Sequence, residues 1–234
     1  MKIALLGYGK MGKTIERLAL YKGHEIVFKK SRTTSEGDLK LADVAIDFSI
    51  PETAFNNIKG ALELDIPVVS GTTGWLDQYN EIIKFCYSRN GSFIYASNFS
   101  VGVQLFFHLN EHLAHLMKPW QDYSPEITEI HHTQKLDAPS GTAITIAEGV
   151  LKHSTKNRWE LDSDDPSAVS IEAKREGEVK GTHIVTYTST IDTLQISHEA
   201  HTREGFAQGA IIAAEWLQQK KGVYSMKDVL GLKK

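Results

Sequence analysis

Residues 2–12 read Lys2-Ile3-Ala4-Leu5-Leu6-Gly7-Tyr8-Gly9-Lys10-Met11-Gly12, an apolar run that ends in a glycine turn. Ile15, Leu18 and Ala19 follow at helical spacing, so the stretch predicts a strand, a tight turn and a helix. In a G-x-G-x-x-G turn, the first glycine permits the tight turn, the second lets a pyrophosphate approach the backbone, and the third lets the helix pack on the strand. We therefore expect a dinucleotide cofactor to bind at Gly7, Tyr8, Gly9, Lys10, Met11 and Gly12.

The end of the next strand bears on the choice of cofactor. The apolar run Glu25-Ile26-Val27-Phe28 continues into Lys29-Lys30-Ser31-Arg32, without an acidic residue. In a NAD site an acid at this place binds the ribose hydroxyls, whereas an arginine accommodates the 2′-phosphate of NADP. Ser31 and Arg32 therefore predict a cofactor-binding loop that favours NADPH, with NADH as the alternative cofactor. A solvated basic loop without a role is the other reading of these residues.

Three further apolar runs end in small polar residues. They are Val44-Ala45-Ile46-Asp47-Phe48-Ser49, Pro67-Val68-Val69-Ser70-Gly71-Thr72-Thr73-Gly74 and Phe93-Ile94-Tyr95-Ala96-Ser97-Asn98-Phe99-Ser100. An open parallel sheet binds its ligand at the carboxyl ends of the strands, where these polar residues would lie. We expect cofactor contacts from Gly71, Thr72, Thr73, Ala96, Ser97, Asn98 and Phe99.

The pattern changes near residue 103. A helical stretch to Lys118-Pro119 is followed by strand-like segments at residues 127–132, 169–175, 182–189 and 193–201, which predict a four-stranded sheet. Residues 206–217 predict an amphipathic helix that is apolar enough to cover a sheet, and the tail from Gly222 is a short coda. We infer that the chain returns to the first domain near Arg203. The sequence predicts an α/β protein: a doubly wound, Rossmann-like dinucleotide-binding domain of residues 1–102 and 204–234, interrupted by a mostly β, α+β substrate domain of residues 103–203.

Composition and charge exclude several classes of protein. The formal net charge of −3 offers no general attraction to nucleic acid or to anionic membranes. Cys86 is the only cysteine, so an intrachain disulfide and a cysteine-based zinc site are both excluded. The first apolar run is too short for a signal-peptide core, and no later run reaches transmembrane length. We expect a cytoplasmic protein with a small-molecule substrate and no nucleic-acid or membrane partner.

The densest chemistry lies in Glu126-Ile127-Thr128-Glu129-Ile130-His131-His132-Thr133-Gln134-Lys135-Leu136-Asp137-Ala138-Pro139-Ser140-Gly141-Thr142-Ala143. Imidazoles move protons near neutral pH, and the free N–H groups at a helix start hold anions. The stretch therefore predicts acid catalysis on an anionic substrate. Adjacent strand residues face opposite sides, so His131 and His132 can share a site only if the strand ends there. We expect no metal, because the sequence has no H-E-x-x-H motif and no cysteine nearby.

These residues resemble the 4-hydroxy-tetrahydrodipicolinate reductase (dihydrodipicolinate reductase) family of the diaminopimelate route to lysine. The family's E-x-H-H-x-x-K-x-D-A-P-S-G-T-A segment matches Glu129 to Ala143 without a departure. The resemblance implies hydride transfer from NAD(P)H to a cyclic imine dicarboxylate, with His131 as proton donor and Lys135 as a second donor or a carboxylate clamp. It places His132, Gly141 and Thr142 on the substrate carboxylates and implies a homotetramer associated through the strand-rich domain.

Two departures from the family's pattern concern the cofactor. The glycine turn is one residue shorter than the common G-x-x-G-x-x-G, and Ser31-Arg32 stands where many members have an acid followed by arginine. The second departure strengthens the prediction of NADPH. A dinucleotide-sensing regulator on the same fold, or a small dehydrogenase such as an aspartate dehydrogenase, remains as an alternative function.

Overall fold

The structure, a computed structural model, describes residues 1–232. The chain divides into two compact units. The first unit joins Met1–Val101 to the chain from Glu204 onward, and the second unit is Gly102–Arg203. None of the helices in residues 1–232 combines the length and the apolar character that a membrane span needs.

The first unit is built on a seven-stranded sheet with the order β12-β6-β5-β4-β1-β2-β3. Its strands are β1 (Lys2–Leu6), β2 (Glu25–Lys30), β3 (Ser35–Gly37), β4 (Val44–Asp47), β5 (Val68–Ser70), β6 (Ser92–Tyr95) and β12 (Gly222–Tyr224). All neighbours pair in parallel except β2 and β3. The chain runs from β1 to β2 on one side and later to β4 on the other, so the strand order reverses beside β1. This arrangement is the Rossmann-like sheet that the sequence predicts, and its reversal point is the usual ligand site.

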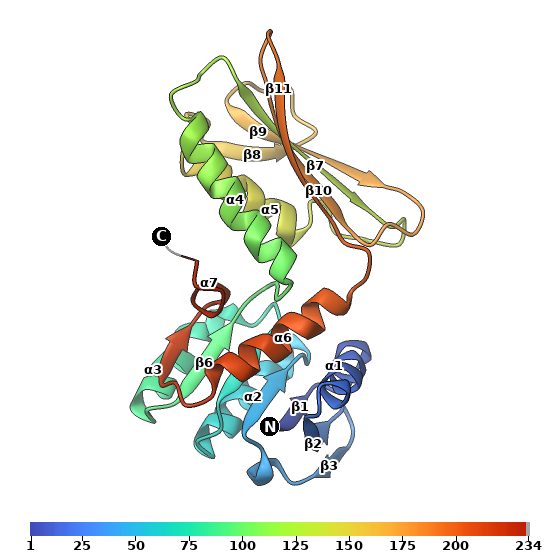
Figure 1. Cartoon of the computed structure of the whole chain (residues 1–234), viewed down its shortest axis with the longest axis vertical. Helices are drawn as coiled ribbons and strands as arrows, with labels where there is room; N and C mark the ends of the chain where they lie inside the picture. Colours follow the sequence, from blue (N-terminus) through green and yellow to red (C-terminus); the bar gives the residue numbers. More distant parts are fainter. Residues whose placement is uncertain (233–234) are drawn as a thin grey trace. The chain divides into compact units, whose positions relative to one another are not determined.

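Helices cover both faces of this sheet: α1 (Lys10–Tyr21), α2 (Pro51–Glu63), α3 (Tyr79–Ser88), α6 (Glu204–Leu217) and α7 (Met226–Val229), with short 3₁₀ turns at Leu39–Leu41 and Leu76–Gln78. Ile3 and Leu5 of β1 join a core with α1 and α6, whereas Ala4 and Leu6 join a core with α2 and α3. The apolar run in β1 is therefore continuous because both of its faces are buried. Figure 1 shows α6 and α1 side by side.

The second unit is built on a five-stranded sheet with the order β11-β10-β7-β9-β8. Its elements are α4 (Val101–Met117), β7 (Ser124–His131), α5 (Gly141–Leu151), β8 (Arg158–Leu161), β9 (Ala168–Arg175), β10 (Thr182–Thr188) and β11 (Thr193–Glu199). Strand β7 pairs antiparallel to β10 and parallel to β9. As Figure 1 shows, α4 and α5 lie on one face of the sheet, where their apolar side chains form a core with β7, β9 and β10.

The structure corrects the sequence prediction at three short strands. The second sheet has five strands instead of four, because Arg158–Leu161 adds β8 beside β9. The segment from Gly222 onward has secondary structure that the sequence analysis did not predict, since Gly222–Tyr224 pairs with β6 and Met226–Val229 forms α7. Strand β3 was not predicted either. Each of these strands has three or four residues, too few for an alternating pattern to stand out, and each depends on a partner strand.

Candidate active site

The glycine turn after β1 has the geometry that a pyrophosphate needs. Gly7 has φ +110°, and a Cβ there would stand 2.2 Å from the carbonyl oxygen of Phe48. A Cβ on Gly12, near the start of α1, would stand 2.3 Å from the carbonyl oxygen of Gly7. At Gly9, by contrast, a Cβ would meet nothing within 4 Å. Gly7 and Gly12 thus serve close packing, while the open space at Gly9 fits close approach by a ligand.

A cavity of about 450 Å³ opens beside this turn. It collects the residues that follow three parallel strands at the reversal point: Gly7, Tyr8 and Gly9 after β1, Lys30, Ser31, Arg32 and Thr33 at and after β2, and Phe48, Ser49 and Ile50 after β4, with Thr53 and Asn57 from α2. Five of the predicted cofactor residues therefore lie around one pocket. Lys10, Met11 and Gly12 begin α1 directly after it.

The basic residues at the end of β2 differ in their partners. Lys29 forms an ion pair with Glu16 (2.8 Å), and the Lys30 ammonium donates to the side-chain oxygen of Asn57 (2.8 Å). Within residues 1–232, the exposed guanidinium of Arg32 has neither an ion pair nor a hydrogen bond. Arg32 is therefore the cation of this cluster that is available to an anionic ligand.

The other predicted cofactor residues follow β5 and β6, and several serve the fold. Asp47, which is fully buried, accepts hydrogen bonds from the hydroxyls of Ser49, Ser70 and Thr72 (2.7–2.8 Å). Burial raises the pKa of Asp47, which these hydrogen bonds oppose. The side chain of Phe99 lies in the core, so a ligand could meet only its backbone. Gly71, Thr72 and Thr73 come directly after β5, and Ala96, Ser97, Asn98 and Phe99 directly after β6.

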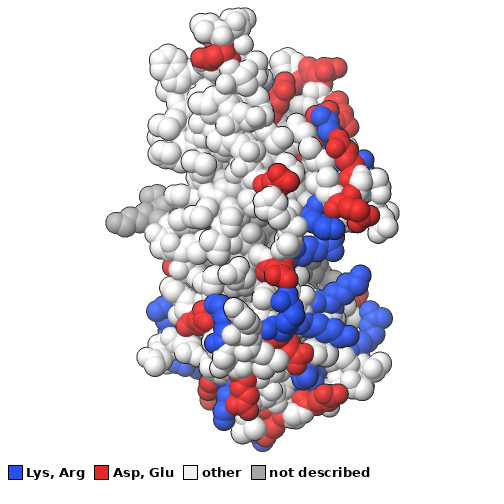
Figure 2. All heavy atoms as spheres, turned by 45° about the vertical axis from the view of Figure 1, so that its right-hand side comes forward, with Lys and Arg blue, Asp and Glu red and all other residues white. Residues whose placement is uncertain are grey.

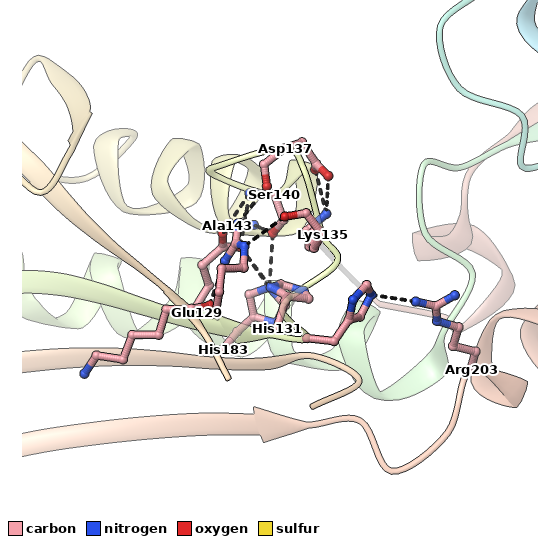
Figure 3. Close-up of polar contacts among 11 residues, drawn as sticks. Glu129, His131, Lys135, Asp137, Ser140, Ala143, His183 and Arg203 are labelled. Atoms are coloured by element: carbon pink, nitrogen blue, oxygen red, sulfur yellow. Dashed lines mark hydrogen bonds and ion pairs between the residues drawn. The ribbon is translucent and has the colours of Figure 1, made fainter. Parts of the chain in front are cut away.

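The predicted proton donor lies on the covered face of the second sheet. Along β7 buried residues alternate with more exposed ones, and Glu129 and His131 are both on the buried side. In the sheet register His183 of β10 stands opposite Glu129, and Arg175 of β9 stands beside His131. The two imidazole rings of His131 and His183 meet edge to face, with centroids 5.2 Å apart. Four ionisable side chains thus gather on one face of the sheet. Figure 3 shows three of them, Glu129, His131 and His183.

Glu129 is the centre of this group. Its carboxylate is fully buried and accepts the Ser140 backbone N–H at both oxygens (3.1 Å each) and Arg175 Nη2 at Oε1 (3.2 Å). Its Oε2 lies 3.5 Å from His131 Nδ1 and 3.8 Å from His183 Nε2. A buried carboxylate is tolerated only with such partners. Arg175 also donates to the carbonyl oxygen of Asp137 (2.7 Å), which ties the loop after β7 to the sheet.

Strand β7 ends at His131, so the structure meets the condition under which His131 and His132 could share a site. His132 leaves the strand, and its Nε2 accepts a hydrogen bond from Arg203 Nη2 (2.9 Å). In the following loop the Lys135 ammonium, with 18% of its side chain exposed, holds both carboxylate oxygens of Asp137 (2.7 and 2.6 Å). This bond to Lys135 lowers the pKa of Asp137. Figure 3 shows the Lys135 pair and Arg203.

The start of α5 leaves backbone donors without a partner. Ser140 is the N-cap, and its hydroxyl accepts the backbone N–H of Ala143 (3.1 Å). Within the described chain the N–H groups of Gly141 and Thr142 have no hydrogen-bond partner, and a Cβ on Gly141 would meet nothing within 4 Å. Two free N–H groups at the positive end of a helix suit a carboxylate.

The two buried histidines differ in how strongly their surroundings act on them. Burial lowers the pKa of His183 to about 3, so this ring is neutral at neutral pH. Burial also lowers the pKa of His131, but the Glu129 carboxylate opposes that shift. In the described residues Glu129, His131 and His183 are also the one group with metal-ligand spacing. Arg175, which is already bound to Glu129, places a fixed positive charge against a metal cation there.

Sequence reasoning missed four residues of this site. Glu129 was quoted as part of the motif without a role, although the E-x-H spacing on a strand puts both side chains on one face. Arg175, His183 and Arg203 lie 40 or more residues from Glu129 in the sequence, and no local pattern marks them. Only the pairing of β9 and β10 with β7 brings the first two to the site.

The pKa of His183 predicts a pH dependence of stability. The unfolded chain binds a proton on this ring below pH 6.5, whereas the folded chain resists it down to about 3, so stability falls as the pH falls below 6.5. Between pH 7.5 and 5 the wild type should lose about 2 kcal/mol more free energy of unfolding than His183→Gln. The free energies of unfolding of both proteins are measured by urea unfolding, followed by circular dichroism, at both pH values. Equal losses in the two proteins would contradict the burial of a neutral His183.

Comparison with known proteins identifies the family. A model described as the N-terminus of dihydrodipicolinate reductase matches residues 1–99, and one described as its C-terminus matches residues 102–230. The curated 4-hydroxy-tetrahydrodipicolinate reductase of Christiangramia forsetii is 53% identical in an alignment of 233 residues that covers 98% of this chain and 98% of the relative. The protein of the same name from Methanoregula boonei is 33% identical, covering 100% of this chain and 99% of the relative.

Solved structures agree on the fold. Dipicolinate-bound dihydrodipicolinate reductase from Paenisporosarcina sp. TG-14 has a TM-score of 0.77 at 20% identity, covering 96% of this chain and 97% of that one. Aspartate dehydrogenase from Thermotoga maritima has a TM-score of 0.54 at 12% identity, covering 94% and 97%. These structural likenesses carry the fold alone, whereas the family models and the close sequence relatives cover nearly the whole chain. The chain therefore belongs to the dihydrodipicolinate reductase family.

Proposed function

We propose that this chain catalyses the NAD(P)H-dependent reduction of 4-hydroxy-tetrahydrodipicolinate, also called dihydrodipicolinate, to tetrahydrodipicolinate in the diaminopimelate route of lysine biosynthesis. The relatives that bear this name match nearly the full chain. In this reaction the hydroxylated substrate loses water to give a conjugated C=C–C=N system, which then gains a hydride and a proton. The chain must therefore hold a dicarboxylate, hold a reduced dinucleotide and supply the proton.

One observation carries the proposal: Glu129 contacts both His131, the proposed proton donor, and the N-cap of α5, the proposed anion site. Its carboxylate faces Nδ1 of His131 and accepts the N–H of Ser140, the residue that caps α5. Glu129 therefore fixes the start of α5 relative to His131. A substrate whose carboxylate binds at Gly141 and Thr142 would then have its ring held in a fixed position relative to His131. In this proposal His131 protonates the substrate as hydride arrives, with Lys135 as partner.

The substrate carboxylates have several candidate partners. We assign them to the free N–H groups of Gly141 and Thr142 and to His132, with Arg203 as an added cation beside His132. Lys135 is held by Asp137 in the structure, and a substrate carboxylate would compete for the same ammonium. The Paenisporosarcina reductase has been solved with dipicolinate, a ring with two carboxylates, which supports an anion site of this kind.

We assign the dinucleotide to the first unit and the substrate to the second. Residues 1–102 with 204–234 would form the dinucleotide-binding domain, and residues 103–203 the substrate-binding and oligomerisation domain. When bound, the reduced dinucleotide supplies the hydride, and the cavity at the glycine turn fits its phosphates. The proposal includes no metal. We place the enzyme in the cytoplasm, since a chain with one cysteine gains no internal disulfide in an oxidising compartment.

Two other functions are less well supported. A dinucleotide-sensing regulator would have no use for a histidine facing a buried carboxylate and an open helix start. An aspartate dehydrogenase shares the fold, but the likeness is 12% in sequence and carries no more than fold.

The activity test is NADPH oxidation on addition of the product of the preceding synthase, in buffer with EDTA. The wild type should oxidise NADPH, and His131→Gln should lower kcat by about 10² or more with a modest change in KM, the scale of losing a general acid. His115→Gln, an exposed histidine on α4, serves as the control. Background oxidation by folded wild-type protein would contradict the reductase proposal, and normal turnover by His131→Gln would remove its proposed role.

We propose that NADPH is favoured over NADH because Arg32 lines the cofactor cavity and has no ion pair or hydrogen bond within residues 1–232. Arg32→Ala should weaken NADPH binding by about tenfold or more, the scale of one charge-assisted contact, and leave NADH binding within about twofold. Fluorescence titration with both cofactors measures this, with Lys40→Ala, an exposed lysine outside the cavity, as control. Equal weakening of both cofactors would rule out a phosphate contact at Arg32.

We also propose that four copies associate through the second unit. The sheet face away from α4 and α5 has no covering layer within this unit, and β11 is an edge strand. Leu105, Leu109 and Leu116 of α4 and Leu194 of β11 are all more than 40% exposed, and Figure 2 shows broad uncharged surface. Sedimentation should give four times the 26.1 kDa of one chain. A monomer at micromolar concentration would contradict this.

A further inference from the structure

The two nitrogens of the His131 ring have different surroundings. Nδ1 is fully buried and has no hydrogen-bond partner within residues 1–232, although it lies 3.5 Å from Glu129 Oε2. On the other side, a Cβ on Gly181 would stand 3.2 Å from His131 Nε2. Gly181 therefore lies against Nε2 without a side chain, and any other residue there would crowd this nitrogen. The carboxylate of Glu129 lies on the Nδ1 side of the ring, and the backbone of Gly181 lies on the Nε2 side.

We propose that Glu129 is a positioning residue that holds the Nδ1–H of His131, so that the transferable proton lies on Nε2, the nitrogen on the Gly181 side of the ring. This inference rests on the proposed reductase function and deepens it. At 3.5 Å the contact is long for a hydrogen bond, as is common for such pairs before substrate binds. A carboxylate that orients an imidazole and stabilises its cation is a general device of proton-transfer sites.

The positive charges around His131 disfavour its protonated form, so the imidazolium depends on Glu129. Arg175 from β9 and Lys135 from the loop after β7 are positive and lower the pKa of His131, in addition to the larger effect of burial. His183 from β10 is neutral, and Asp137 is bound to Lys135. Glu129 is the chief group that favours the imidazolium. Without its charge the imidazolium would face a buried site with two cations nearby.

The arrangement of Glu129 explains why it can act on His131 without leaving its place. Arg175 binds Oε1, whereas Oε2 faces the two histidines, and the Ser140 N–H spans both oxygens. One oxygen is thus fixed by the fold and the other is directed at the proton donor. A metal ion held by Glu129, His131 and His183 would be repelled by the positive charges of Arg175 and Lys135.

The kinetic test compares two glutamate substitutions on the same strand. Glu129→Gln removes the buried charge, and Glu126→Gln removes an exposed charge from the opposite face of β7. In Glu129→Gln the alkaline fall of kcat should move to lower pH by about one unit or more. At about pH 7.5 kcat should drop about tenfold or more, and near pH 5.5 the deficit should narrow to about threefold. Glu126→Gln should keep the wild-type profile.

A purely structural role for Glu129 would instead lower kcat equally at all pH values, and that result would overturn the inference. Glu129→Asp keeps the charge, so the alkaline fall of kcat should lie closer to its wild-type pH in this variant than in Glu129→Gln. Titration with NADPH checks that the first unit is intact in each variant. If the wild type turns over and the limb does not move, this inference fails while the reductase function stands.

A measurement on the wild type covers the case in which Glu129→Gln does not fold. Long-range proton–nitrogen NMR of the chain with ¹⁵N-labelled histidine reports which ring nitrogen carries the proton, and His131→Gln identifies the signals. At high pH, neutral His131 should carry its proton on Nδ1, facing Glu129. A proton on Nε2 in the neutral ring would contradict the inference, whatever the kinetics of the variants.

Discussion

The site in the second unit depends on one buried carboxylate. Glu129 has no exposed surface, and an unpaired charge there would be strongly destabilising. Its partners come from three separate places: Arg175 on β9, the backbone of Ser140 before α5, and the histidine face of β7 and β10. The loop after β7 is therefore fixed at both ends. The position of this loop in turn determines where the proposed substrate-binding residues lie.

The first unit handles its polar groups in a related way. Asp47 is buried at the end of β4, and it accepts hydrogen bonds from three hydroxyls, those of Ser49, of Ser70 at the end of β5 and of Thr72. The polar strand ends that the sequence marks as ligand contacts are thus partly used to hold each other in place, as Thr72 shows by accepting the Ser49 N–H (2.8 Å) and donating to Asp47. What this leaves for a dinucleotide is mainly backbone and open space at Gly9, together with Arg32, a cavity-lining cation without a partner in residues 1–232.

The sequence predicts those parts of the protein that local chemistry determines. The glycine turn is recognisable because Gly7 and Gly12 are positions where any side chain would collide with backbone. The motif from Glu129 to Ala143 is recognisable because strand, loop and helix cap follow one another directly. Strands β8 and β12 could not be predicted, since their few residues acquire strand structure by pairing with β9 and β6. For the same reason Arg175 and His183 became part of the site only through sheet register, and Arg203 only through its bond to His132.

The central claim is that this chain moves a hydride from a reduced dinucleotide to a cyclic imine dicarboxylate. Transfer of a label tests it most directly. With NADPH that carries deuterium at the transferable position, mass spectrometry of the reduced product should show one added deuterium when the wild type turns over in ordinary water. A reduced product without the label, or no reduced product from folded protein saturated with both ligands, would contradict the account.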